Sequence, residues 1–107
     1  MPLMSAMKID FDGLPWVSAG PGARFKSVDR GRKRIRIVEF THEFLEPEWC
    51  QKGHIGLVLK GELEIDFRGE RVRYPEGSGI FIEAGPNGAH KARAVTSRVQ
   101  LFVVEDA

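Results

Sequence analysis

Hydrophobic and polar residues alternate along much of this chain with a period of two, which is typical of half-buried β-strands. The clearest case is residues 34–40, Arg-Ile-Arg-Ile-Val-Glu-Phe. A second is residues 62–67, in which Leu63, Ile65 and Phe67 alternate with acidic residues and therefore share one face. No segment sustains the 3.6-residue period of an amphipathic helix, so we expect an all-β protein.

Glycine and proline divide these patterns into short segments. Turns are expected at Gly31, Gly61, Gly69 and residues 75–79, because Pro and closely spaced Gly do not fit a central ladder. The expected strands are residues 24–28, 34–40, 55–60, 62–67, 71–74, 80–82, 90–94 and 99–104. This number of short strands favours a β-sandwich or barrel, and 107 residues suffice for one domain.

The first 23 residues differ from the rest in being rich in Gly, Pro and small side chains. We interpret residues 1–23 as an N-terminal arm and residues 24–107 as the β-domain. Within the arm, residues 8–11 are expected to form a short edge strand, and residues 14–17 an apolar plug that packs on the body or on a second subunit.

Charge excludes some classes of partner. The net charge is +1 and 29% of residues are charged, which gives no reason to expect binding to nucleic acid or to an acidic membrane. One basic cluster exists, and we interpret it as a solvated strand face that protects an edge rather than as an anion-binding patch. It comprises Arg24, Lys26, Arg30, Arg32, Lys33, Arg34 and Arg36.

The sequence also suggests a compartment. A single cysteine allows no intrachain disulfide. The N-terminus has no apolar segment followed by a signal-peptidase site, and no run approaches the ~18 apolar residues of a membrane span. We therefore expect a cytoplasmic protein.

Candidate chemistry lies before and after the central strands. Glu48, Cys50 and His54 stand at positions i, i+2 and i+6, and in an extended chain these side chains share one face. His90 follows a buried strand and a Gly-rich loop. Thiolate, imidazole and carboxylate together suit a divalent transition metal such as Zn, Ni or Fe. Each residue also has an ordinary structural interpretation, such as a small buried hydrophobe for Cys50.

The spacing of these residues resembles the first motif of the cupin family of small jelly-roll barrels, G-x5-HxH-x3or4-E-x6-G. Gly61 occupies the final Gly and His54 the place of the Glu. Cys50 and Glu48 occupy the two His places, and His42 falls at the opening Gly.

The second cupin motif, G-x5-P-x-G-x2-H-x3-N, is matched from Gly77 onward. Residues 83–85 stand where Pro-x-Gly is expected, and His90 supplies the His after a loop that is two residues longer. Ala94 takes the place of the closing Asn. The resemblance covers roughly residues 34–104. Three of the four ligand positions have changed type, yet each replacement is still a possible metal ligand.

The resemblance implies an all-β, single-domain cupin jelly-roll barrel that binds a divalent transition metal (Zn, Ni or Fe). The implied ligands are Glu48, Cys50, His54 and His90. The family includes isomerases, dioxygenases, decarboxylases and lyases, so the resemblance implies a metal-dependent enzyme that acts on a small polar molecule without choosing the reaction. The alternative is a metal-free binding or sensor module for a sugar or an organic acid. A homodimer is expected in either case. An apolar pocket is expected to be lined by Trp49, Leu57, Tyr74, Phe81 and Phe102.

Overall fold

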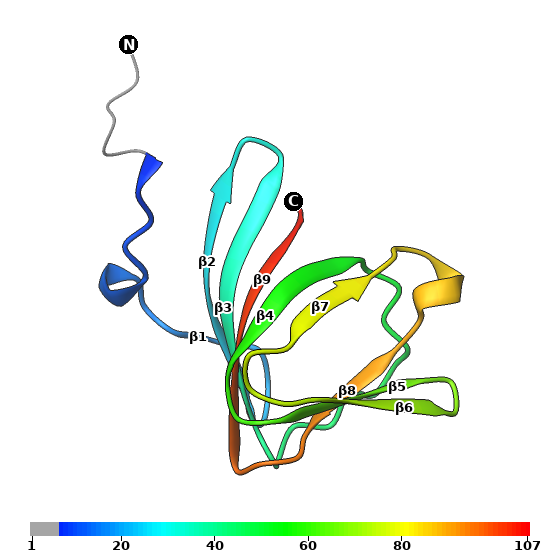
Figure 1. Ribbon diagram of the computed structural model, residues 1–107. Coiled ribbons are helices and arrows are strands. Elements are labelled where there is room, and N and C mark those ends of the chain that lie inside the picture. Colours follow the sequence, from blue (N-terminus) through cyan, green and yellow to red (C-terminus); the bar gives the residue numbers. More distant parts are fainter. Residues whose placement is uncertain (1–6) are drawn as a thin grey trace.

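A computed structural model describes residues 7–107 of the chain, so the first six residues of the predicted arm lie outside the described part (Figure 1). Its strands form two antiparallel sheets, ordered β1-β2-β3-β9-β4-β7 and β6-β5-β8. The sheets are hydrogen-bonded separately, so one continuous ladder does not close the barrel over residues 7–107. The strands are β1 (Val17–Ser18), β2 (Ala23–Arg30), β3 (Lys33–Thr41), β4 (His54–Lys60), β5 (Leu63–Phe67), β6 (Glu70–Tyr74), β7 (Gly79–Ile82), β8 (Lys91–Ala94) and β9 (Arg98–Asp106).

The all-β prediction is confirmed. Each strand predicted within the β-domain is present, with ends that differ by at most two residues. The helical elements η2 (Phe11–Gly13) and η3 (Pro86–Gly88) are single 3₁₀ turns. Within residues 7–107, no helix is long and apolar enough to span a bilayer. The homodimer is not tested by a single chain and stays a prediction.

Alternation along the large sheet decides what the two sheets enclose. On β9, the buried side chains are Val99, Leu101, Val103 and Glu105, and they face the small sheet. On β5, Leu63 and Ile65 face back and are at most 2% exposed. These side chains and their neighbours form one hydrophobic core, in which burying each large aliphatic side chain stabilises the fold by about 1.5–3 kcal/mol.

The arm packs on the outer face of the large sheet, and its edge strand lies later than predicted. Residues 8–10 form no strand, and the chain turns at η2, where Gly13 N–H donates to Asp10 O (3.2 Å). The ring of Phe11 packs edge-to-face on Phe102, with centroids 6.5 Å apart. The edge strand is β1, which pairs with β2. A local Asp–Gly turn therefore displaces the predicted strand along the chain.

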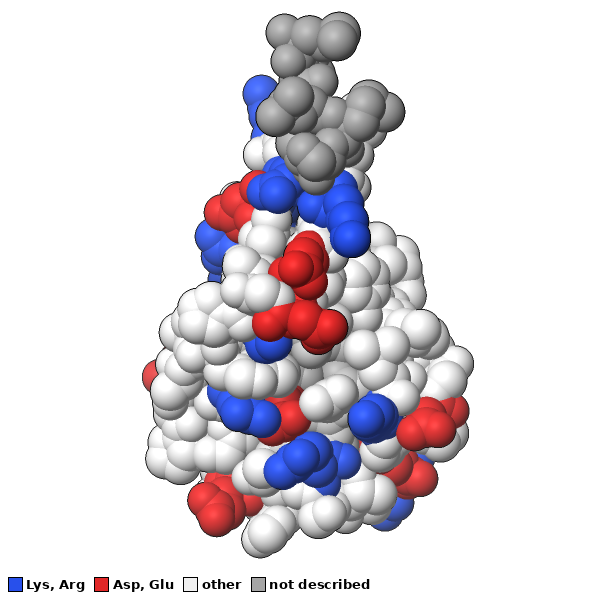
Figure 2. Space-filling model, turned by 90° about the vertical axis from the view of Figure 1, so that its left-hand side faces the viewer, with Lys and Arg blue, Asp and Glu red and all other residues white. Residues whose placement is uncertain are grey.

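The basic cluster is only partly a solvated face. Figure 2 shows basic and acidic side chains interspersed on the side that carries β2 and the arm. Arg24 donates to the buried carboxylate of Glu39 (2.8 Å), and Arg34 pairs with Asp29. Arg36 departs from the prediction, because strand alternation turns it inward, together with Val38 and Phe40, to the wall of the cavity between the sheets.

Gly61 sets the turn by which the chain passes from the large sheet to the small one. Its φ is +77°, and a Cβ placed there would lie 2.2 Å from the carbonyl oxygen of Arg98. Arg98 is the first residue of β9, so the turn at Gly61 packs backbone against backbone on the start of that strand. The glycine at the end of the first motif thus has a steric reason.

We expect Gly61→Ala to destabilise the protein more than Gly31→Ala does. Gly31 also has a positive φ (+60°) but lies in open space, so its replacement carries only the left-handed backbone penalty of about 1–2 kcal/mol. The clash at Gly61 adds roughly 1–3 kcal/mol. Urea unfolding of both variants tests this, and equal free energies of unfolding would contradict it.

The buried carboxylate of Glu39 is expected to make the folded protein less stable in acid. Burial alone would raise the pKa of this carboxyl, but hydrogen bonds from Arg24 and Gln100 and the charges of Arg24 and Arg98 outweigh it. The pKa is therefore lowered below its ordinary value of 4.5. A carboxyl with a lowered folded-state pKa stabilises the fold above its unfolded-state pKa, and that contribution is lost as pH falls through the folded-state value.

We therefore expect Glu39→Gln to reduce the free energy of unfolding by about 1–3 kcal/mol at pH 7. The deficit should shrink as pH falls below 4.5 and through the lowered folded-state pKa, where wild-type Glu39 also becomes neutral. Denaturant unfolding across pH 3–7 measures the difference. Glu76→Gln, at an exposed turn position, is the control and should show no comparable pH dependence. A deficit that is constant with pH would contradict the assignment.

Candidate metal centre

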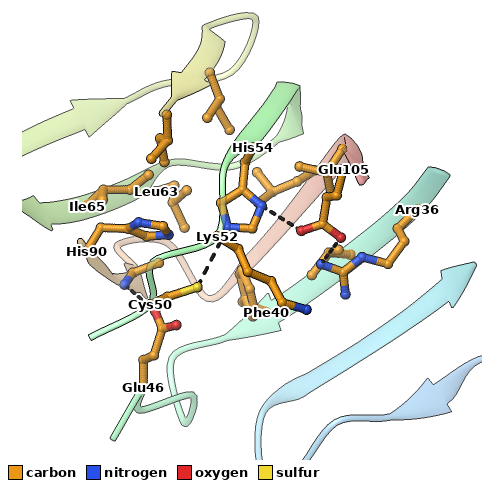
Figure 3. A pocket seen from close by; sticks show the side chains of 16 residues that line it. Arg36, Phe40, Glu46, Cys50, Lys52, His54, Leu63, Ile65, His90 and Glu105 are labelled. Carbon is orange, nitrogen blue, oxygen red and sulfur yellow. Dashed lines mark hydrogen bonds and ion pairs between the residues drawn. The ribbon is translucent and has the colours of Figure 1, made fainter. Parts of the chain in front are cut away.

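The side chains of Cys50, His54 and His90 converge at one end of the space between the sheets (Figure 3). One ligand atom from each lies within 4.8 Å of the others. Cys50 Sγ is 4.0 Å from His54 Nε2, and the two imidazole rings stand 5.1 Å apart and nearly perpendicular. Three donors from three separate segments thus face a common point.

Backbone pairing fixes all three donor residues. Cys50 and His90 form an isolated antiparallel bridge, in which each N–H donates to the other's carbonyl at 2.9 and 3.0 Å. This bridge joins the connector before β4 to the loop before β8. His54 is the first residue of β4 and is anchored by pairing with Ile82 on β7. Backbone hydrogen bonds therefore position all three donor residues.

The loop that is two residues longer than the second motif positions His90. It forms η3, and the carbonyl of Gly88 lies 2.8 Å from His90 Nδ1. Since a carbonyl only accepts, Nδ1 carries the proton and Nε2 keeps its lone pair. Gly88 is required here, because a Cβ would lie 2.1 Å from the carbonyl oxygen of Glu83.

The carboxylate of Glu105 is the acceptor at Nδ1 of His54, as the Gly88 carbonyl is for His90. Nδ1 of His54 lies 2.6 Å from Glu105 Oε2, an ion-pair distance with a bent hydrogen-bond angle. Glu105 Oε1 in turn accepts from Arg36 at 2.7 Å. An acceptor at Nδ1 favours the tautomer in which Nε2, the nitrogen on the Cys50 side, is free. Both histidines are thus oriented to offer Nε2.

The charge of Glu105 is stabilised where it is buried. Its side chain is 5% exposed, and burial alone would raise its pKa. The contact with His54 and the positive charges of Arg36 and Lys52 outweigh this, so the pKa is lowered. Glu105 is therefore ionised at neutral pH and able to hold the His54 tautomer.

A cavity of about 180 Å³ adjoins the cluster. Most of its wall is apolar, formed by Val38, Phe40, Leu63, Ile65, Ile80, Ile82, Ala92, Leu101 and Val103. Its polar side chains are Arg36, Glu46, Lys52 and Glu105, in addition to the three donors. An apolar pocket with a few convergent polar groups is typical of small-molecule sites.

Glu48, the fourth predicted ligand, lies apart from the other three. Its side chain is exposed, and it is not part of the cluster. The chain bends at Glu48, so Glu48 and Cys50 do not share a face as the i, i+2 spacing implied. Glu46 lines the cavity instead, where its carboxylate accepts from the backbone N–H of Ala92 (2.8 Å).

The predicted pocket lining is not the lining that the structure has. Leu57 and Phe81 are 40% and 72% exposed on the outer face of the large sheet, where Phe102 contacts the arm. Trp49 lies beneath Arg68 and Lys91, and Tyr74 is half-buried against the core away from this cavity. Aromatic size suggested a pocket wall, whereas strand alternation turns these side chains elsewhere.

Sequence reasoning missed Arg36 and Glu105. Both carried a usable signal, because each continues the inward alternation of its strand, Arg36 with Val38 and Glu105 with Leu101 and Val103. A charged residue in phase with buried aliphatics is unusual and indicates a paired or functional group.

The three donors fit a transition metal. Donors bound tetrahedrally at ~2.0–2.3 Å from an ion stand roughly 3.5 Å apart, so shifts of about 1 Å or less would close the observed cluster. Two imidazoles with free Nε2 atoms and a thiol suit Zn, Fe or Ni better than Mg or Ca, which prefer oxygen ligands.

Comparisons with known proteins give a fold rather than a relative of known activity. No family model and no curated protein matches the sequence. Among solved structures, apo-HppE superposes with a TM-score of 0.73 at 16% identity, covering 91% of this chain and 56% of HppE. This chain thus spans just over half of that protein's length.

Two further solved structures are closer to this chain in length. KdgF from Halomonas sp. gives a TM-score of 0.72 at 21% identity and covers 90% of this chain and 91% of its own. A cupin-2 domain protein from Shewanella frigidimarina gives 0.63 at 20% identity, over 78% and 79%. Together with the two motifs and the paired antiparallel sheets, these likenesses show that the chain has the cupin fold.

Proposed function

We propose that this protein holds a divalent transition metal at Cys50, His54 and His90 and binds a small polar molecule in the adjoining cavity. The observation that carries the proposal is the orientation of both imidazoles. Each is held at Nδ1 by an acceptor, Gly88 O or Glu105, so that Nε2 is left for a ligand bond.

Three protein ligands beside a cavity are typical of a catalytic rather than a structural metal site, because a coordination position stays open. One solved structure of similar fold is named Fe(II) HppE, at 15% identity and a TM-score of 0.72. A bound metal would supply Lewis-acid polarisation of a carbonyl or activation of water or O₂.

The chain's own residues supply orientation and a dry environment. Glu105 holds His54 in one tautomer, and Arg36 keeps Glu105 charged and in place. The aliphatic wall excludes water and lowers the local dielectric, which strengthens every charge interaction at the site. Cys50 brings a thiolate, which makes the site softer than one built from His and carboxylate alone.

The second candidate is a metal-free binding module in the same cavity, in which Cys50 and His54 only pack and form hydrogen bonds. Metal content separates the two functions directly. The same measurement also tests whether Glu48 takes part, since the sequence predicted it as a ligand and the structure leaves it exposed.

Purified protein reconstituted with Zn²⁺ is expected to retain about one ion per chain after dialysis. Cys50→Ser and His90→Ala should each lower the affinity by at least about tenfold, because each removes one of three ligands. Glu48→Gln is the control and should bind as wild type does. Inductively coupled plasma mass spectrometry gives the stoichiometry. Metal-free wild type would favour the metal-free module, and equal retention in all variants would show that the zinc binds outside this cluster.

Glu105→Gln tests the positioning of His54. The glutamine amide can donate to Nδ1 and so favour the opposite tautomer, which places the proton on Nε2. We expect a roughly 10–100-fold loss of zinc affinity, the usual effect of removing an outer carboxylate. Competition with a coloured chelator measures it.

Asp106→Asn is the matched control for that substitution, because Asp106 is adjacent, exposed and paired only with Lys33 among the described residues. It should leave zinc affinity unchanged. Thermal unfolding of each metal-free protein verifies folding. Wild-type affinity in a folded Glu105→Gln protein would show that the carboxylate does not set the tautomer.

A further inference from the structure

The geometry points to a small carboxylic acid as the cavity's ligand, with its carboxylate near Arg36 and Lys52 and an apolar remainder against the aliphatic wall. This inference deepens the proposed function and rests on it, since the bound metal contributes to the charge that favours an anion. The charged side chains, the volume and the lining each bear on it separately.

Arg36 carries a buried donor that lacks an acceptor. Its guanidinium pairs with Glu105 through one terminal nitrogen, and Figure 3 shows the group reaching into the cavity. Its Nε is buried and has no hydrogen-bond partner among the described residues. A buried unpaired donor on a cationic side chain is costly, and a ligand carboxylate is the acceptor that its planar, forked donors match best.

Lys52 adds a second cation at the same cavity. It lies in the connector between Cys50 and β4, and its stem lines the cavity while the residue as a whole is exposed. No ion pair is present for Lys52 among residues 7–107, unlike Arg36. A flexible ammonium at the rim can therefore follow an entering anion without first breaking a salt bridge.

The charges around the cavity balance only without metal. Arg36 and Lys52 are offset by Glu46 and Glu105. A divalent ion bound to one thiolate leaves an excess of positive charge in a largely apolar enclosure, where an anion is favoured and a cation is excluded. The carboxylate of Glu46 also accepts a hydrogen bond from the backbone N–H of Ala92, so part of its capacity to interact with a cation is already used.

The volume and the wall bound the size and polarity of the ligand. A cavity of about 180 Å³ is close to the ~150 Å³ cavity known to hold benzene, so a ligand of roughly six to ten non-hydrogen atoms fits. Ile80, Ile82 and Leu101 offer no hydrogen bonds, which disfavours a polyhydroxylated sugar. A short aliphatic or aromatic monocarboxylate suits the site, because its carboxylate can meet Arg36 and Lys52 while its apolar part packs on the aliphatic wall.

Paired acids and amides test this directly. Benzoate and hexanoate are titrated against benzamide and hexanamide by calorimetry, with zinc-loaded and with chelator-treated protein. We expect each acid to bind the zinc form at least about tenfold more tightly than its amide, because only the acid carries charge for Arg36 and Lys52.

Substitutions locate the charge. Lys52→Met should weaken benzoate binding at least about threefold and leave benzamide unchanged, and Lys52→Arg should restore benzoate binding. Lys60→Met, at an exposed residue of β4 outside the cavity lining, is the control and should have no effect. Because Lys52 is exposed, its replacement leaves the fold intact, which thermal unfolding verifies.

The outcomes separate this inference from the metal proposal. Stoichiometric zinc with no preference for acids over amides, with no acid binding at millimolar concentration, or with no effect of Lys52→Met would overturn the carboxylate inference alone. Acid binding that depends on Lys52 in a protein that takes up no metal would overturn the metal proposal and leave the carboxylate inference standing on the side chains.

Discussion

A buried carboxylate must be paired, and the pairing of Glu105 constrains the rest of this site. Glu105 on β9 is 5% exposed and contacts Arg36 on β3 and His54 on β4. These three strands are neighbours in the large sheet, so the pairing depends on their register. A slip of one residue would turn Glu105 to the outer face and leave Arg36 and His54 without their acceptor.

The same register builds the cavity beside the charges. Strand alternation that brings Glu105 inward also brings Val103 and Leu101 inward, so one strand supplies both the charged end and the aliphatic wall. The small sheet covers the opposite side. Low polarity around the charges strengthens each interaction, while the backbone bridge between Cys50 and His90 keeps two donors in place without relying on the charges.

Most of the strands and turns are determined by local sequence patterns and could therefore be predicted from the sequence. Period-two patterns located the strands, and Gly61 marked a turn that only glycine fits. The limits appear where a local preference competes with tertiary packing. Residues 8–10 have strand-like composition, but the Asp10–Gly13 turn bends the chain, and Phe11 then finds its partner on Phe102. That contact joins positions far apart in sequence, which no pattern within the arm contains.

The sequence by itself determined that Cys50, His54 and His90 were candidates, because motif spacing fixes their places on particular strands and turns. Only the tertiary structure decided that they converge, that Glu48 lies apart, and that Glu105 faces inward. Alternation establishes which residues share a face of a strand, but which face is enclosed depends on the partner sheet. Non-local packing therefore decides which face is enclosed, and it does so only once the two sheets have packed together.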